Sequence, residues 1–171
     1  MNATTNRHGS ATVTRTSDTE LVITRKFDAP ARLVFKAWTT PELVKRWWGF
    51  ETSQWLVCEI DLRVGGRWRF VMFDKDSTPP EVGFHGEYRE IERPHRIVST
   101  EVYEGFPGTE EDGSVNTMTF EEREGVTTMT THVQMRLKEH LDAMIQTGME
   151  SGMQISYNRM EDVIAELERA R

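Results

Sequence analysis

The sequence has little of what would cross-link the chain or anchor it in a membrane. Cys58 is the only cysteine among 171 residues, so no disulfide can form within the chain. A lone thiol fits a reducing compartment, and we expect a cytoplasmic protein. No apolar run approaches the roughly 20 residues that a membrane-spanning helix needs, so we expect no membrane insertion.

Positive charge is also in short supply. The chain has 21 Lys and Arg residues against 28 Asp and Glu residues, which gives a formal net charge of −7. Nucleic acids and anionic membrane surfaces both bind through clustered positive charge. We therefore expect no nucleic-acid partner.

Metal and catalytic signatures are missing as well. The five histidines lack the spacing of zinc-binding motifs. Gly65-Gly66 follows a strand-like segment but opens another strand, whereas a phosphate-binding loop leads into a helix. We expect no metal and no cofactor, and an enzyme is less favoured than a binding protein.

The N-terminal residues differ in composition from the rest. Residues 1–19 are rich in Thr, Ser and Asn and have no apolar period, which predicts a disordered tail. Residues 20–171 are then expected to form one domain. This length is sufficient to bury a sizeable core.

Apolar spacing along the domain predicts a strand, two short helices and a run of strands. Residues 21–27 alternate as in a strand, and Pro30 and Thr40-Pro41 are typical helix starts. From residue 55 the period is two, and Gly65-Gly66 is expected to be a hairpin turn. Further strands are expected at 82–91, 96–104, 115–122 and 126–135. Seven short strands joined by turns indicate an antiparallel meander.

A long amphipathic helix is predicted at the C-terminus, between residues 146 and 169. Its apolar stripe has steps of three and four and consists of Met149, Met153, Tyr157, Met160, Ile164 and Leu167. Gly148 and Gly152 are expected within this helix, where each costs about 1 kcal/mol relative to alanine. Their presence predicts either a close approach of the sheet or open space.

Four segments together resemble one known family. They read FDAPARLVFKAWTTPELVKRWWG, DLRVGGRWRFVM, HGEYREIERPHRIVST and TGMESGMQISYNRMEDVIAEL. They are similar to the family named after the activator of the heat-shock chaperone ATPase, within the START and birch-pollen-allergen superfamily. The resemblance spans about residues 20–169. It implies an α+β helix-grip fold: a curved antiparallel sheet of about seven strands wrapped around a long C-terminal helix, with two short helices after the first strand.

The resemblance also implies a cavity between the sheet and the long helix, opening near the helix pair. Trp47 and Trp48 would then lie at its mouth, one inward and one on the rim. Many relatives carry tryptophan after the second glycine of the helix motif, where this chain has Met153. The smaller thioether is expected to leave more room beneath the sheet.

The candidate ligand-binding residues combine the two tryptophans that the resemblance places at the cavity mouth with residues that strand alternation and helix spacing direct inward. They are Trp47, Trp48, Trp68, Phe70, Met72, Phe84, Tyr88, Met118, Met129, Met149, Met153 and Tyr157. The methionines are either adaptable core filler or a soft pocket wall, and the glycine spacing together with Met153 favours the wall.

Charged strand residues are assigned to the opposite, solvated face. His85 and Glu87 share one face of a strand and could serve acid–base chemistry in a cavity. Alternation favours an outward position, because Phe84 and Tyr88 have the opposite parity. Arg67 is likewise expected to point outward with Arg69.

Three functions remain open. The first is binding of a small hydrophobic or amphipathic molecule in the sheet–helix cavity. The second is a co-chaperone domain of the stress response that acts by protein–protein contact. The third is a cyclase or lyase in the same cavity, which requires a buried acid–base group that alternation does not supply. The sequence leaves both a monomer and a homodimer open.

Overall fold

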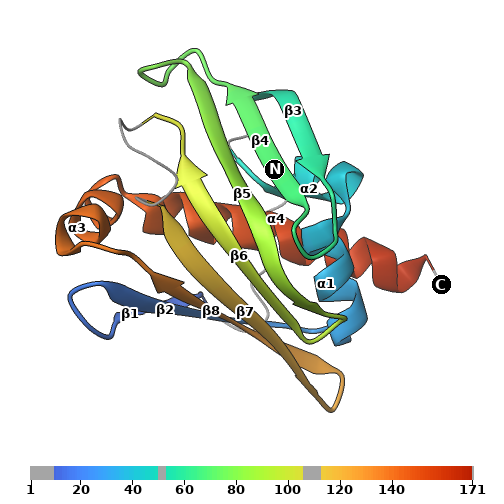
Figure 1. The fold of residues 1–171 in the computed structure, drawn as a ribbon. Helices are drawn as coiled ribbons and strands as arrows, with labels where there is room; N and C mark the ends of the chain where they lie inside the picture. The colour runs from blue at the N-terminus through green and yellow to red at the C-terminus, as the bar shows by residue number, and fades with distance from the viewer. Residues whose placement is uncertain (1–9, 50–52, 106–112, 171) are drawn as a thin grey trace.

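The computed structural model describes residues 10–49, 53–105 and 113–170. An antiparallel sheet of eight strands curves around a long helix, α4, which crosses behind it in Figure 1. The strand order is β1-β2-β8-β7-β6-β5-β4-β3. This is the predicted α+β helix-grip architecture, with one strand more than expected.

The strands are β1 Thr12–Arg15, β2 Glu20–Phe27, β3 Gln54–Ile60, β4 Arg67–Phe73, β5 Glu81–Glu92, β6 Arg96–Tyr103, β7 Ser114–Arg123 and β8 Val126–Gln134. The helices are α1 Ala31–Thr39, α2 Pro41–Trp47, α3 Lys138–Gln146 and α4 Met149–Arg169. Pro41 occupies the first turn of α2, as its fixed φ angle favours.

The additional strand lies in the segment that the sequence assigned to a disordered tail. β1 pairs with β2 from Thr12 opposite Thr24 to Arg15 opposite Leu21. Ala11, just before it, is 5% exposed. The prediction of disorder is therefore wrong for residues 12–15, because pairing to the sheet edge requires no apolar period. Residues 1–9 lie outside the described residues.

The C-terminal helix begins later than predicted, and a separate helix precedes it. Gly148 has a φ angle of 75° and lies between α3 and α4. This left-handed conformation is readily adopted by glycine and ends regular helices. Gly148 is therefore explained by the junction, and the prediction that it lies within the long helix is wrong.

The core lies between the concave face of the sheet and the helices. Because side chains alternate along a strand, every second residue of β2 points to α4, including Leu21, Ile23 and Phe27. Helices α1 and α2 cover one end of this core, where α2 lies beside β3 and α1 lies beside β7 and β8. Val34 and Val44, one from each helix, are fully buried.

Candidate functional site

The two adjacent tryptophans at the end of α2 differ in their environment. Trp47 is fully buried, and its Nε1 donates a hydrogen bond to the Ala37 carbonyl at 3.0 Å. Trp48 is partly exposed and lies edge-on to Phe70 and Phe84, with ring centroids 5.3 and 6.0 Å away. Trp47 is thus part of the packed core, whereas Trp48 joins that core to the molecular surface.

The predicted ligand residues gather around one apolar core. All except Met72 belong to it or pack against it, and Met72 is itself buried. Eight are almost fully buried: Trp47, Trp68, Phe70, Met72, Tyr88, Met118, Met129 and Tyr157. Four are partly exposed: Trp48, Phe84, Met149 and Met153. That these side chains touch a ligand stays a prediction.

Burial along α4 changes abruptly at Tyr157. The buried residues of this helix are Tyr157, Met160, Glu161, Val163 and Ile164. Residues 149–156 contain no buried position, although Met149 and Met153 pack against the core. The first half of α4 therefore leaves its core-facing side chains in contact with solvent.

Polar side chains lie on the concave face of the sheet, on the neighbouring strands β6 and β7. Glu101 pairs with Ser114, and Ser99 pairs with Asn116. The next pair on the same side of the strands, Ile97 and Met118, belongs to the apolar core. Directly opposed residues point to the same face, so the four polar residues also face the interior. We call Ser99, Glu101, Ser114 and Asn116 the interior polar patch.

Glu101 is the titratable group of this patch. Burial raises the pKa of its carboxyl to about 7, and a hydrogen bond with the Asn116 side chain acts in the opposite direction. Tyr157 of α4 faces the same region, since burial and then the charge of Glu101 raise the pKa of its phenol. A carboxyl with this pKa can exchange a proton near neutral pH.

The interior polar patch was missed by sequence reasoning. In the β6 sequence RIVSTEVY, both alternating sets contain apolar residues, so either could face the core. Val98 and Val102 suggest one parity, and Ile97 suggests the other. The pairing of Ile97 with Met118 resolves this choice, but it requires the register of two strands.

A buried arginine on β2 also faces the interior. Arg25 is 1% exposed, and its Nη2 lies 2.9 Å from Oε2 of Glu161 on α4. Nη1 donates to Asn158, and the guanidinium stands over the Phe27 ring at 5.3 Å. Burial lowers the pKa of Arg25, and Glu161 partly offsets this effect. Arg25 has the parity of Leu21 and Ile23, which is the signal that could have revealed it.

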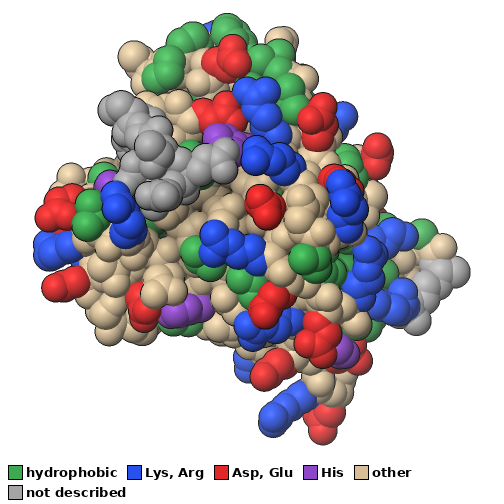
Figure 2. All heavy atoms as spheres, viewed as in Figure 1, with side chains coloured by type: hydrophobic (Ala, Val, Ile, Leu, Met, Phe, Trp, Pro, Cys, Tyr) green, Lys and Arg blue, Asp and Glu red, His purple; other side chains and the backbone are tan. Residues whose placement is uncertain are grey.

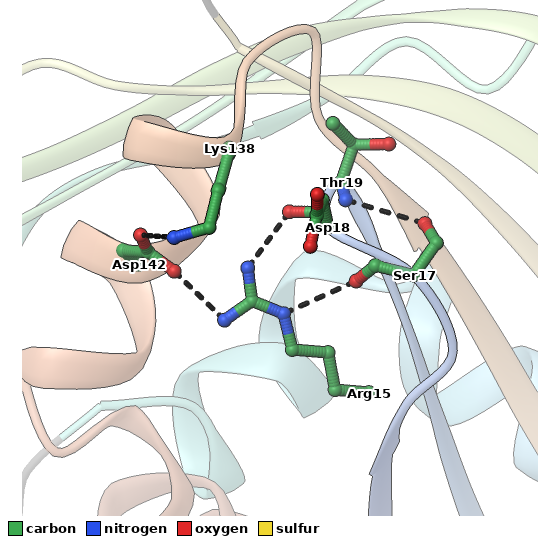
Figure 3. Close-up of polar contacts among 6 residues, drawn as sticks. All are labelled: Arg15, Ser17, Asp18, Thr19, Lys138 and Asp142. Carbon is green, nitrogen blue, oxygen red and sulfur yellow. Dashed lines mark hydrogen bonds and ion pairs between the residues drawn. The ribbon is translucent and has the colours of Figure 1, made fainter.

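The N-terminal segment forms polar contacts with α3 and α4, the two helices that border the partly exposed interior. The Ala11 amide donates to Gln154 of α4 at 2.9 Å, and the Gln154 amide donates to the Ala11 carbonyl at 2.7 Å. Figure 3 shows Arg15 reaching Asp142 of α3, with Nη1 2.7 Å from Oδ1. Lys138 approaches the other carboxylate oxygen of Asp142 at 2.7 Å. Residues 11–15 thus connect the sheet edge to both α3 and α4.

The opposite face of the sheet is polar. Figure 2 shows acidic and basic side chains interspersed over the face that points away from α4. Arg67 and Arg69 are exposed, as predicted, and Arg69 forms a two-pronged ion pair with Glu104 at 2.8 and 3.1 Å. His85 Nδ1 lies 2.8 Å from the same carboxylate. These contacts give the charged side chains structural partners.

Two hollows occur on the surface of the described residues. One, of about 710 Å³, lies at the β3–β4 hairpin and is lined by Glu59, Ile60, Asp61, Arg63, Gly65 and Arg67. The other, of about 540 Å³, is lined by Glu59, Arg67, Trp68, Arg69, His85, Gly86 and Glu104. Neither lining includes a residue of α4. The second hollow shares only Trp68 with the predicted ligand residues, and the first shares none of them.

Two further features concern the described part of the chain. No group of three His, Cys, Asp or Glu side chains within it could hold a metal ion. No helix there has both the length and the apolar character needed to cross a membrane.

Comparisons with known proteins identify relatives of this fold. A protein from Mycobacterium smegmatis is 26% identical, with 90% of this chain and 96% of that chain covered and a TM-score of 0.78. A protein from Rhodobacter sphaeroides is 23% identical, with 92% and 99% covered and a TM-score of 0.83. A third structure, described as an HSP90 activator from Plasmodium falciparum, is 25% identical, with 68% and 72% covered and a TM-score of 0.52.

No curated protein matches the chain by sequence similarity. The family model described as Activator of Hsp90 ATPase homolog 1-like protein matches residues 28–165. This match covers most of the 171 residues and includes the helix pair, strands β3–β8, α3 and most of α4. The chain therefore belongs to the family of Activator of Hsp90 ATPase homolog 1-like proteins.

Proposed function

We propose that this protein binds a small amphipathic molecule between the concave face of the sheet and the first half of α4. The observation that carries the proposal is the change of burial at Tyr157. Beyond it the helix is packed into the core, whereas Met149 and Met153 remain partly exposed. Apolar side chains that face a core but stay accessible offer surface that a ligand can cover.

The composition of this region supports the same function. Phe84, Met149 and Met153 supply apolar surface, and the thioethers can adapt to ligands of different shape. The interior polar patch adds hydrogen-bonding groups on the concave face of β6 and β7. Binding pockets for small molecules commonly combine a largely apolar lining with a few polar groups.

The substitution Met153→Trp tests the proposal. The indole is expected to fill the space beside the sheet, so that binding of the neutral apolar dye Nile red falls at least tenfold while the melting temperature is kept or raised. Ile155→Trp is the matched control. Ile155 lies on the same helix and is 55% exposed, so this substitution adds the same indole on the solvent side. Equal dye binding by both variants and the unaltered protein would contradict the proposal.

A co-chaperone role is a second candidate, supported by the Plasmodium falciparum neighbour and by the family description. It requires a protein partner in place of a small ligand. Purified protein is then expected to raise the ATPase rate of a chaperone of the Hsp90 class. An unchanged rate at saturating protein would remove this candidate and leave ligand binding unaffected.

A further inference from the structure

Hydrogen bonding in the interior polar patch is incomplete. Ser114 is 2% exposed, yet its Oγ has no hydrogen-bond partner among the described residues. Asn116 Oδ1 is buried and is likewise without a partner within them, although the Asn116 side chain hydrogen-bonds with Glu101. Buried polar atoms in folded proteins are nearly always paired, and an unpaired one costs about 1–3 kcal/mol. These atoms therefore require a partner that the described residues do not supply.

The donor and acceptor atoms of the patch determine which chemical group could be its missing partner. Asn116 Oδ1 can only accept a hydrogen bond, and an ionised Glu101 carboxylate also only accepts. The Ser114 hydroxyl can accept or donate. The patch thus has a surplus of acceptors, which a group carrying N–H or O–H donors would satisfy.

An anionic group fits this region poorly. It would lie beside the Glu101 carboxyl, and like charges in a partly desolvated place repel strongly. Arg25 also faces the interior, but its guanidinium is already bonded to Glu161 and Asn158. Arg25 would therefore offer a ligand carboxylate no unengaged cation.

We propose that the interior polar patch holds the head group of the bound molecule, and that this head group is a hydrogen-bond donor such as an alcohol or a primary amine. The inference rests on the proposed function and adds the chemical class of the ligand. The apolar part of the molecule then lies along Met149 and Met153, and its polar end meets Glu101 and Asn116.

Three probes of equal chain length test this class: decylamine, 1-decanol and decanoate, each used to displace Nile red below its aggregation limit. Decylamine and decanol are expected to bind about tenfold more tightly than decanoate, because a hydrogen bond to a charged group contributes about 1.5–3 kcal/mol. Glu101→Gln is expected to reduce this preference to less than threefold. The control is Glu59→Gln, which removes the same charge from an exposed position on β3 and should keep the preference.

The outcomes separate the two proposals. Decanoate binding as tightly as decylamine, or a preference that survives Glu101→Gln, would overturn the donor assignment while leaving ligand binding intact. Failure of the protein to bind Nile red and all three probes would overturn the proposed function itself, and the donor assignment with it. If Glu101→Gln does not fold, the comparison of the three probes on the unaltered protein still tests the donor assignment.

Discussion

Replacing Glu101 by glutamine is expected to change how the stability of the protein depends on pH. Glutamine keeps the size of the side chain and one acceptor oxygen, but it cannot ionise. The native carboxyl has a pKa of about 7, above the ordinary value of 4.5, because burial disfavours its charged form. Between these values the native state binds more protons than the unfolded state, so unfolding becomes easier as pH rises.

The size of the effect follows from this pKa. Below about pH 4.5 the carboxyl is protonated in both states, and above about pH 7 it must be charged inside the fold. The full shift corresponds to roughly 3 kcal/mol, and partial exposure of the side chain reduces this to about 2–3 kcal/mol. Glu101→Gln should therefore become more stable than the unaltered protein by about that amount as pH rises from 4 to 8.

Urea unfolding of both proteins at one-unit pH steps measures the effect. Other titratable groups are common to the two proteins, so their contributions cancel in the difference of unfolding free energies. The difference should rise with pH and level off above about pH 7. A difference that stays flat from pH 4 to 8 would refute the buried position of Glu101, and with it the interior polar patch.

Two further predictions concern other parts of the fold. Deleting residues 1–16 removes β1 and both hydrogen bonds between Ala11 and Gln154, and should lower the unfolding free energy by about 2 kcal/mol in urea titrations; an unchanged midpoint would show that this segment contributes nothing to stability. Arg25→Met leaves the Glu161 carboxylate buried without its partner and should cost about 3–5 kcal/mol. The double variant Arg25→Met/Glu161→Leu should recover most of that loss, and a double variant as unstable as the single one would contradict the ion-pair explanation.

The sequence predicted the helix-grip fold because its signals are local and repeated. The alternation in Trp68, Phe70 and Met72 and the spacing from Met149 to Leu167 each define an element without reference to the rest of the chain. The predicted outward positions of Arg67 and Arg69 also rest on alternation, and the structure confirms them.

Features that depend on pairing between distant segments were harder to predict. β1 has no apolar pattern, and its only sequence signal is a Thr-rich stretch that equally fits a tail. The interior position of Glu101 depends on the register of β6 and β7, because both parities of β6 contain apolar residues. Arg25 could have been found from its parity, but a buried arginine requires a partner, Glu161, that lies 136 residues away.

Methionine-methyl NMR tests the central claim most directly, namely that a ligand binds between the sheet and the first half of α4. Methionine methyl groups report on both halves of that helix. Met149 and Met153 lie in the first half, and the fully buried Met160 lies in the second. Titration with decylamine should shift the Met149 and Met153 methyl signals most, together with Met118 beside the interior polar patch, while Met160 stays nearly unchanged. Signals of Met149 and Met153 that remain still at saturating decylamine would contradict the account.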